Sequence, residues 1–596
     1  MPEILIIGSA SLDTLHIKGQ PVSSPGGAGM YTAMAAKRSG ANVAMFGPRP
    51  DPMPDILRPV DERCDRWFGP SVTQEELPRF EIKHEGDKAV YLDFFIRAEL
   101  RLDPGDLPAD LLKFDGLHII PLGDPEHQHK FVRECRKRGA RYISTGTFIK
   151  DVKENPDVVR TTMDASDVFF MNEEEAVCFF GSLDTAKTSP GKLLFITLGR
   201  KGALVIQGDY QTHVPAYPAE ILDPTGAGDT FCGAALANLL RGIHPVMAAR
   251  MATILAAQEI ENIGPAALLW DAPPPSMQLD DRVEINPLQV EEIARIIKYL
   301  PEAGPFDFTS DDLPPAGHPL ALEYFFISTL QQFSFWEDRD GKYDYPLIAS
   351  IDGALLKGSS YLYRSYLRPL DSDPDFYSPS RQAELTEEEL LAVYRADDGT
   401  DPIPAFDLHL QQARQYGQDM LSMGITARDA VARANQSDTP LKTFLMLLDH
   451  IGGYKEDPTR KKSMLLALCL NQRPEAFLRF GKDEVPTPVV DYHAMRTCLR
   501  TGMINVLDKS FETKLADRQL ISREEEWSVR YATYKIQENV ALISGKAIGA
   551  VDWFFFNYMR SHCPEMSEPV CRECAINPVC AHRKDLFQPV IRTTFY

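Results

Sequence analysis

The sequence lacks the features of a membrane or exported protein. No apolar run reaches about 18 residues, the length a helix needs to span a bilayer, so we expect no transmembrane segment. The first residues carry no basic segment, and the apolar run at residues 4–7 therefore predicts a buried strand rather than a signal peptide. These absences predict a cytoplasmic protein without a membrane partner.

The sequence also lacks an excess of positive charge. It has 63 Lys and Arg against 85 Asp and Glu, a formal net charge of -22, which disfavours unspecific binding to nucleic acid. Cysteine is sparse as well, because ten cysteines in a chain of 596 residues do not form the framework of a small disulfide-rich protein. We therefore expect no nucleic-acid partner and a reducing environment.

The length of the chain and a change in its sequence pattern indicate two domains. A chain of 596 residues is too long for one hydrophobic core, and its 44% hydrophobic and 25% charged residues are ordinary for globular proteins. Residues 270–276 form a proline-rich break, after which the pattern changes. We predict one domain over residues 1–270, a linker over 271–284 and a second domain over 285–596.

The first half has the pattern of an α/β domain. Short β-rich apolar runs alternate with helix-like segments, which predicts a mainly parallel sheet with helices on both faces. Two alternating runs at residues 80–84 and 90–96, joined by 85–88, predict a hairpin that could serve as a lid. The runs expected as buried strands are 4–8, 43–47, 117–122, 142–145, 168–171, 193–198 and 203–206.

The nonapeptide at residues 223–231 is the most informative stretch. Gly226 and Gly228 allow close approach of the backbone to a phosphate, at the start of a helix whose unpaired N–H groups and dipole favour anions. Asp229 follows directly, where it could take a proton from a hydroxyl that attacks the γ-phosphate of ATP. The alternative is a glycine-rich turn that caps an ordinary helix.

Two features near the N-terminus follow the first expected strand. Asp13 could hold a sugar diol, or it could be part of a surface turn. Gly26 and Gly27 precede an apolar helix and permit close approach of a substrate, or they form a flexible linker. Open α/β sheets bind ligands at the carboxyl ends of their strands, so these positions are candidates for an acceptor site.

Two later features could serve a nucleotide. Asn172 and Glu175 follow a strand and could organise a hydrated Mg²⁺, although an acidic helix start explains them as well. Thr197, Gly199 and Gly202 lie in a strand and tight turn that fits nucleotide phosphates or forms a simple hairpin.

The order and spacing of these motifs resemble the ribokinase-like (pfkB) family of sugar and nucleoside kinases over residues 1–270. The resemblance implies ATP and Mg²⁺ as cofactors, and it departs from the family at Tyr31, where Asn is common, and at residues 144–148, which replace an Asp-Pro pattern. It implies Asp229 as catalytic base, Gly226, Ala227 and Gly228 as anion hole, Asn172 and Glu175 for Mg²⁺, Thr197, Gly199 and Gly202 for ATP, and Asp13, Gly26, Gly27 and Tyr31 for the acceptor.

The second half has helical periodicity. We expect a mostly α-helical domain with helices at residues 290–299, 387–394, 408–423, 440–449, 461–470 and 540–560. No repeat of solenoid length is visible in the sequence.

Asp491 stands out in this half. It is a natural N-cap for the helix that follows, and it could also be a catalytic carboxylate that steadies an oxocarbenium-like cation. The Val490-Asp491-Tyr492-His493 setting resembles that of helix-hairpin-helix base-excision glycosylases. Upstream, residues 459–463 are either a solvated basic turn or a phosphate site.

Four cysteines near the end have a specific spacing. Cys563, Cys571, Cys574 and Cys580 are separated by seven, two and five residues, which suits a [4Fe–4S] cluster or a structural Zn²⁺. The pattern resembles the cluster loop of endonuclease III, with a first gap one residue longer. Four unrelated cysteines are the alternative.

Aromatic and charged pieces of residues 285–596 resemble, in the same order, the queuosine salvage family of queuosine 5′-phosphate N-glycosidases. The resemblance rests on segments 333–336, 376–377, 395–397, 490–492, 526–530 and 591–596. It implies a glycosylase-like fold, catalytic Asp491 with Lys461 or Lys462, and substrate contacts by Phe333, Trp336, Arg395, Asp397 and Arg530.

Together the halves predict a bifunctional salvage enzyme for a small-molecule nucleoside. ATP-dependent 5′-phosphorylation of a queuosine-like deazaguanine nucleoside would precede hydrolysis of the N-glycosidic bond. Two alternatives stay open: a DNA-repair-type iron–sulfur glycosylase fused to a sugar kinase, and a sugar kinase with a non-catalytic helical module. The oligomeric state also stays open, a homodimer included.

Overall fold

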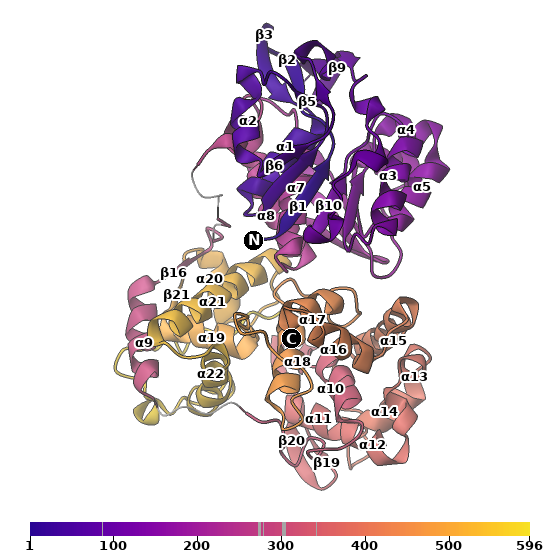
Figure 1. The fold of residues 1–596 in the computed structure, drawn as a ribbon. Coiled ribbons are helices and arrows are strands. Elements are labelled where there is room, and N and C mark those ends of the chain that lie inside the picture. Colours follow the sequence, from indigo (N-terminus) through magenta and orange to yellow (C-terminus); the bar gives the residue numbers. More distant parts are fainter. Residues whose placement is uncertain (86–87, 272–275, 278, 301–305, 341) are drawn as a thin grey trace. The chain divides into compact units, whose positions relative to one another are not determined.

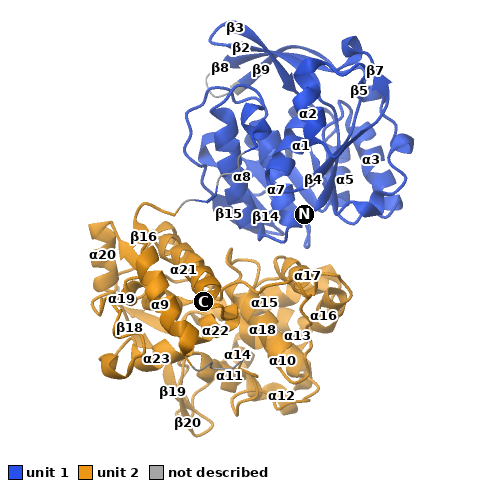
Figure 2. Ribbon diagram, turned by 60° about the vertical axis from the view of Figure 1, so that its left-hand side comes forward, with its two compact units in different colours: residues 1–277 blue, residues 278–596 orange. Residues whose placement is uncertain are grey.

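The computed structural model describes the chain except residues 86–87, 272–275, 278, 301–305 and 341. The chain forms two compact units, unit 1 from Met1 to Met277 and unit 2 from Gln278 to Tyr596 (Figure 2). The turn of the predicted hairpin and the proline run of the predicted linker lie outside the described residues.

Unit 1 is built on a nine-stranded sheet in the order β15-β14-β13-β12-β11-β10-β1-β4-β6. The strands from β6 to β13 pair in parallel, and β14 and β15 add an antiparallel edge, so the predicted mainly parallel sheet is confirmed. The strands are β1 (Glu3–Ile7), β4 (Asn42–Phe46), β6 (Arg66–Phe68), β10 (Gly116–Ile119), β11 (Ile143–Gly146), β12 (Val168–Asn172), β13 (Leu193–Thr197), β14 (Ala203–Gln207) and β15 (Tyr210–Val214).

Helices cover both faces of this sheet (Figure 1). Ile4 and Ile6 of β1 pack in the core that includes α1 (Ala28–Arg38), α7 (Ala227–Leu240) and α8 (Pro245–Ile260). Leu5 and Ile7 face the opposite core with α3 (Pro125–Lys137), because successive side chains of a strand point to opposite faces. Unit 1 also contains α2 (Arg58–Arg63), α4 (Ile149–Glu154), α5 (Pro156–Ala165) and α6 (Glu173–Phe180).

Unit 1 contains a second, four-stranded sheet. Its order is β3-β2-β8-β9, and the antiparallel pairing of β8 with β9 confirms the predicted hairpin. Asp13 lies on β2, so the expected surface turn at that position is wrong. The strands are β2 (Ser11–Ile17), β3 (Gln20–Gly26), β8 (Arg79–Glu85) and β9 (Lys88–Phe95), and we call them the lid sheet.

Unit 2 is mostly helical, as predicted. One core packs around α10 and α18, and a second packs α9 against α19 and α21. Its helices are α9 (Pro287–Tyr299), α10 (Ala321–Leu330), α11 (Ser359–Leu367), α12 (Pro369–Ser372), α13 (Pro379–Ala383), α14 (Glu387–Tyr394), α15 (Phe406–Met423), α16 (Ala427–Asn435), α17 (Pro440–Leu448), α18 (Lys461–Gln472), α19 (Tyr492–Thr501), α20 (Lys509–Ala516), α21 (Arg523–Ser544), α22 (Ile548–Trp553) and α23 (Met559–His562). Short antiparallel pairs join β16 (Val283–Ile285) to β21 (Ile504–Val506), β17 (Trp336–Arg339) to β18 (Lys342–Pro346), and β19 (Ile348–Ile351) to β20 (Ala354–Lys357).

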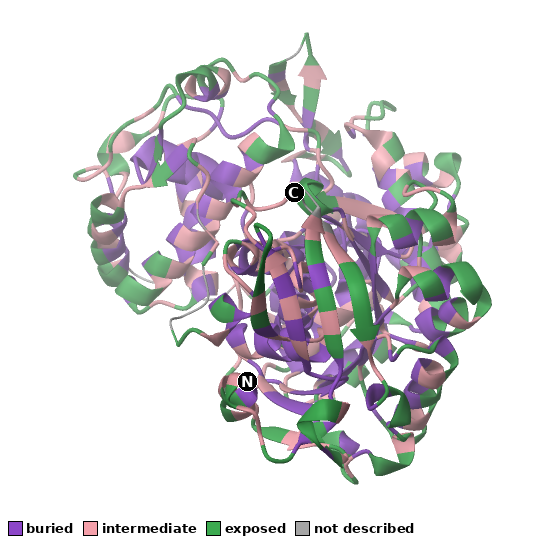
Figure 3. Cartoon of the chain, turned by 90° about the horizontal axis from the view of Figure 1, so that it is seen from above, coloured by how far each residue is buried: buried purple, intermediate pink, exposed green. Residues whose placement is uncertain are grey.

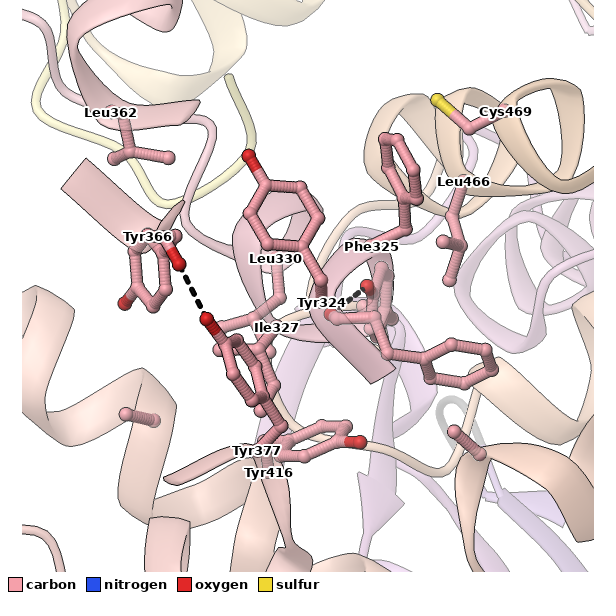
Figure 4. Packing of buried hydrophobic residues seen from close by; sticks show 14 of the residues in the cluster. Tyr324, Phe325, Ile327, Leu330, Leu362, Tyr366, Tyr377, Tyr416, Leu466 and Cys469 are labelled. Carbon is pink, nitrogen blue, oxygen red and sulfur yellow. Dashed lines mark hydrogen bonds between the residues drawn. The ribbon is translucent and has the colours of Figure 1, made fainter. Parts of the chain in front are cut away.

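Buried aromatic side chains dominate the first of these cores. Figure 4 shows Tyr324 and Phe325 of α10 packed near Tyr366 and Tyr377. The hydroxyl groups are satisfied by backbone acceptors, since Tyr324 donates to the Tyr363 carbonyl at 2.7 Å and Tyr377 donates to the Tyr366 carbonyl. Many helices have one buried and one exposed side (Figure 3), whereas α10 and α19 are buried along nearly their whole length.

The single helix expected at residues 540–560 is wrong. Helix α21 ends at Ser544, because Gly545 takes the left-handed conformation with φ 70° and closes the helix as its C-cap. The chain resumes as α22 at a bend of 116°, followed by a π-helical turn, Phe554–Tyr558. By length and composition alone, this bent pair could form a broken membrane span. Among the described residues, no single helix is long and apolar enough to cross a membrane.

Candidate active sites of the two units

The start of α7 carries the glycine-rich motif. Gly226 is its N-cap and adopts φ 83° and ψ 0°, a conformation that disfavours side chains. A Cβ at this position would lie 2.4 Å from Cδ1 of Tyr31, so glycine is required for space as well. A Cβ at Gly228 would meet no atom within 4 Å. The N–H groups in the first turn of a helix have no intrahelical partner, so a helix start with open space beside it can bind an anion.

Asp229 lies in the first turn of α7 and is partly buried. Burial raises the pKa of its carboxyl to about 7, so the carboxylate is close to half ionised at neutral pH. A carboxyl of that pKa next to an anion site can accept a proton from a hydroxyl. Burial raises the pKa of Glu175 and of the Cys232 thiol, and the negative charge of Asp229 raises both further. These two groups therefore lie near Asp229.

The residues expected at an acceptor site meet on the lid side. Asp13 is 4% exposed, its Oδ1 has no hydrogen-bond partner among the described residues, and burial raises its pKa to about 7. A Cβ at Gly26 would lie 1.8 Å from Oδ2 of Asp13, and Gly27 has φ 93° with its Cβ position 2.6 Å from the Ser9 carbonyl. Burial, followed by the nearby carboxylates, raises the pKa of Tyr31 well above its usual range.

Three further side chains lie at this site, and no sequence motif predicted them. His84 of β8 places its Nε2 3.0 Å from Oδ1 of Asp223, a buried carboxylate that also accepts the Gly264 N–H at 2.7 Å. The Tyr91 side chain on β9 is 52% exposed, and partial desolvation of its hydroxyl, followed by the Asp229 and Asp13 carboxylates, raises the pKa of that hydroxyl. Glu259 of α8 is fully buried, and neither of its carboxylate oxygens has a partner among the described residues. His84 and Tyr91 show that the lid sheet contributes side chains to the site.

The residues expected to serve the nucleotide lie at adjacent strand ends. Asn172 and Thr197 are register partners on β12 and β13. Asn172 and Glu175 form a reciprocal capping box at α6, with N–H···O distances of 2.9 and 2.8 Å, so the helix-start interpretation is confirmed. Burial raises the pKa of Glu175 to about 7. Gly199 has open space around it, whereas a Cβ at Gly202 would lie 2.0 Å from the Val214 carbonyl.

Unit 2 contains a cavity of about 320 Å³ that Asp491 and Lys461 both line. Asp491 caps α19 by accepting the Ala494 N–H at 3.0 Å, so the N-cap prediction is confirmed. Burial raises the pKa of Asp491, and the Lys461 charge opposes that shift. Burial lowers the pKa of Lys461, whose Nζ donates to the Gln332 carbonyl at 3.4 Å. The cavity therefore holds a carboxyl and an amine whose charges interact.

Aromatic side chains form much of the cavity wall. The rings of Phe306 and Trp553 stack at 5.0 Å with an interplanar angle of 11°. Phe335 lines the cavity as well and also faces a small adjoining pocket to which Trp336 belongs. An apolar, aromatic cavity with a few polar groups is suited to a planar heterocyclic ligand.

Two residues expected in the glycosidase site lie in the core instead. Phe333 is fully buried and stacks on His409 at 4.2 Å, and Lys462 donates to the Leu330 carbonyl at 2.8 Å. Neither residue lines the cavity. On α18, Lys461 lines the cavity, whereas the neighbouring Lys462 reaches Leu330 of α10. The interpretation of residues 459–463 as a solvated basic turn is also wrong, since all five are buried.

Three charged residues implied by the same resemblance do not line the cavity either. Arg395 and Asp397 are exposed, and Asp397 accepts the backbone N–H groups of Asp352 and Gly353, both at 2.9 Å. Arg530 is fully buried in an ion pair with Asp457 at 2.6 Å. Their contacts stabilise a hairpin turn and the protein core, respectively.

The four C-terminal cysteines line one cavity of about 20 Å³. Arg500 of α19 contacts two of them. Its guanidinium donates to the Cys563 sulfur at 3.5 Å, and its backbone carbonyl accepts from the Cys580 thiol at 3.8 Å. Within the part of the chain that the structure describes, no group of three or more His, Cys, Asp or Glu side chains is arranged to hold a metal ion. The expected cluster or zinc site thus rests on the spacing and the shared cavity alone.

Comparisons with known proteins bear on unit 1. Residues 107–272 match the model of the pfkB family of carbohydrate kinases. A cytidine kinase of Thermococcus kodakarensis is 28% identical over 252 residues, covering 41% of this chain and 90% of that protein. A ribokinase of Bacillus subtilis is 26% identical, covering 44% of this chain and 94% of that protein.

Solved structures that align with part of the chain include a probable sugar kinase from Rhizobium etli, with 20% identity, a TM-score of 0.40 and coverage of 44% of this chain and 94% of the other. A nucleoside kinase of Burkholderia thailandensis in complex with inosine has 19% identity, a TM-score of 0.38 and coverage of 46% and 94%. The sequence matches identify a ribokinase-like (pfkB) sugar or nucleoside kinase domain in unit 1.

Proposed function

We propose that the chain is a bifunctional nucleoside salvage enzyme. Unit 1 transfers the γ-phosphoryl group of ATP to the 5′-hydroxyl of a nucleoside, and unit 2 then hydrolyses the N-glycosidic bond of the 5′-phosphate. The single observation that carries the first step is the partly buried Asp229 beside the open start of α7. The second step rests on the shared cavity of Asp491 and Lys461.

In the kinase step, Asp229 accepts the proton of the attacking hydroxyl. The N–H groups at the start of α7, with Gly226, Ala227 and Gly228, stabilise the charge on the transferred phosphoryl group. Asp13 and the glycine pair Gly26 and Gly27 hold the ribose, while Tyr31 closes the space above Gly226. The similarity to a cytidine kinase supports a nucleoside as the acceptor.

Asn172 and Glu175 supply oxygen donors of the kind that Mg²⁺ prefers. Their strand-end position beside Thr197, and the interaction of Glu175 with Asp229, support a role next to the ATP phosphates. Mg²⁺ bound there would neutralise phosphate charge. Gly199, with open space around it, leaves room for the nucleotide, and Gly202 shapes the turn against β15.

In the glycosidase step, the Asp491 carboxylate stabilises positive charge on the ribosyl ring and orients the attacking water. Burial in the aromatic cavity raises the pKa of Asp491, and the Lys461 charge favours the ionised form of that carboxylate against this effect. The resemblance to queuosine salvage proteins makes a 7-deazaguanine nucleoside the first candidate substrate. We also propose that the four clustered cysteines bind Zn²⁺ or an iron–sulfur cluster, which metal analysis of the purified chain tests.

A nucleoside panel with ATP and Mg²⁺, analysed by mass spectrometry, tests both steps. Asp229→Asn should slow phosphorylation by about 10²- to 10⁴-fold yet release base from a supplied 5′-phosphate. Asp491→Asn should accumulate the 5′-phosphate. The exposed residues Asp209 and Asp483 provide matched Asp→Asn controls in units 1 and 2. Unchanged base release by Asp491→Asn would refute the glycosidase assignment, and excision of a base from duplex DNA would favour a repair glycosylase.

A further inference from the structure

A second carboxyl group in the unit 2 cavity is not explained by the proposal above. Asp552 belongs to α22, lines the same cavity as Asp491, and is 9% exposed. Its Oδ2 accepts the Val489 N–H at 3.2 Å, which fixes the side chain. Its Oδ1 is buried and has no hydrogen-bond partner among the described residues. A buried polar atom without a partner is costly and is most often retained for a purpose.

The two carboxyl groups of the cavity have different surroundings. Asp491 interacts with the cationic side chains of Lys461 and Arg496, both of which favour its ionised form. Burial raises the pKa of Asp552 well above its usual range, the Val489 hydrogen bond opposes this, and the Asp491 carboxylate adds to it. Two carboxyl groups with such different environments can act as acid and base at the same pH.

The position of Asp552 suits contact with a base. Trp553, the next residue of α22, lines the cavity and stacks on Phe306. A heteroaromatic base that lies against this aromatic wall would present its ring nitrogens near the carboxyl of Asp552. No donor among the described residues competes with a ligand for Oδ1 of Asp552.

We propose that Asp552 is the general acid that protonates the leaving base, an inference that rests on the glycosidase function proposed for unit 2. As the bond between C1′ and the base nitrogen breaks, its electron pair goes to the base, which takes the proton of Asp552. Water adds to C1′ and gives its proton to the Asp491 carboxylate. The net result is transfer of one proton from Asp552 to Asp491, which exchange with solvent reverses. The substrate class is an N-riboside whose base leaves as a neutral heterocycle only when protonated.

Leaving groups of different basicity test this role. The full chain is assayed with a purine-type nucleoside 5′-phosphate and with 4-nitrophenyl riboside 5-phosphate, whose leaving group departs without a proton. Asp552→Asn should slow cleavage of the nucleotide by about 10²- to 10⁴-fold, the usual contribution of a general acid. It should change release of 4-nitrophenolate by less than about threefold, whereas Asp491→Asn should slow both substrates. Asp483→Asn is the matched control and should match the unsubstituted chain on both.

An equal loss on both substrates in Asp552→Asn would overturn the acid role and leave the glycosidase function in place. Failure of the unsubstituted chain to cleave either substrate would overturn both proposals. If Asp552→Asn does not fold, the unsubstituted chain is assayed with a series of aryl riboside 5-phosphates. Its rate should depend weakly on leaving-group pKa. A cleavage rate that falls nearly tenfold for each unit increase in leaving-group pKa would indicate that the leaving group departs without a proton. That result would also overturn the inference.

Discussion

Replacing Asp229 by Asn should slow the kinase and, at the same time, stabilise unit 1 in a pH-dependent way. The carboxyl has an ordinary pKa of 3.8 that burial raises to about 7 in the folded chain. Asn preserves the shape of the side chain but cannot accept a proton, so phosphorylation should fall by about 10²- to 10⁴-fold. The same substitution removes a carboxylate whose charge is disfavoured in the fold.

The sign of the stability effect follows from the two pKa values. Below pH 3.8 the carboxyl is protonated in both the folded and unfolded chains, so its ionisation does not favour either state. As pH rises from about 4 to about 7, only the unfolded chain loses the proton, and the unsubstituted protein loses stability relative to Asp229→Asn. A shift of about 3 units corresponds to at most about 4 kcal/mol, which access of solvent to the open site reduces to about 1–2 kcal/mol.

Urea unfolding of the full chain at pH 5 and pH 8 measures this difference through the unit 1 transition. The gap in unfolding free energy between Asp229→Asn and the unsubstituted chain should be larger at pH 8 than at pH 5. Asp209→Asn, at an exposed position, should show no such change. Equal gaps at both pH values, or full kinase activity in Asp229→Asn, would refute the desolvated-base reasoning.

Three further predictions concern the same framework. Gly226→Ala should destabilise unit 1 by more than about 1 kcal/mol, because φ 83° and the Tyr31 ring oppose a side chain, whereas Gly228→Ala should not; equal thermal unfolding of the two would contradict this. Arg530→Met should destabilise unit 2 by about 3–5 kcal/mol by leaving Asp457 buried and unpaired, with the kinase rate unchanged; an unaltered unit 2 transition would count against the ion pair. Removal of bound metal by a chelator should lower the unfolding temperature of unit 2, and no change in a metal-containing sample would exclude a structural role for the ion.

The sequence predicts the local structure at the start of α7 well. Gly226, Gly228 and Asp229 lie within a few residues, and the backbone at a helix start brings them together without help from the rest of the fold. Asn172 and Thr197 are predictable for another reason, because parallel neighbouring strands end at one edge of the sheet.

Other parts could not be read from local patterns. His84 and Tyr91 reach the unit 1 site from the lid sheet, more than a hundred residues before Asp229, and no local motif marks them. The apolar periodicity of the sequence continues across Gly545, so it does not mark the end of α21. The left-handed backbone conformation of Gly545 ends this helix, and that conformation is visible only in the structure. Asp552 does leave a signal: a single carboxyl within the apolar run of residues 548–556 is costly to bury without a function.

The central claim is that one chain phosphorylates a nucleoside and then cleaves the product. The most direct measurement is a time course of the full chain with a 7-deazaguanine nucleoside, ATP and Mg²⁺, in which nucleoside, 5′-phosphate and free base are quantified together. We expect the 5′-phosphate to rise and then decline as free base appears, with no base in the absence of ATP. Release of base without ATP, or a 5′-phosphate that accumulates without any base, would contradict it.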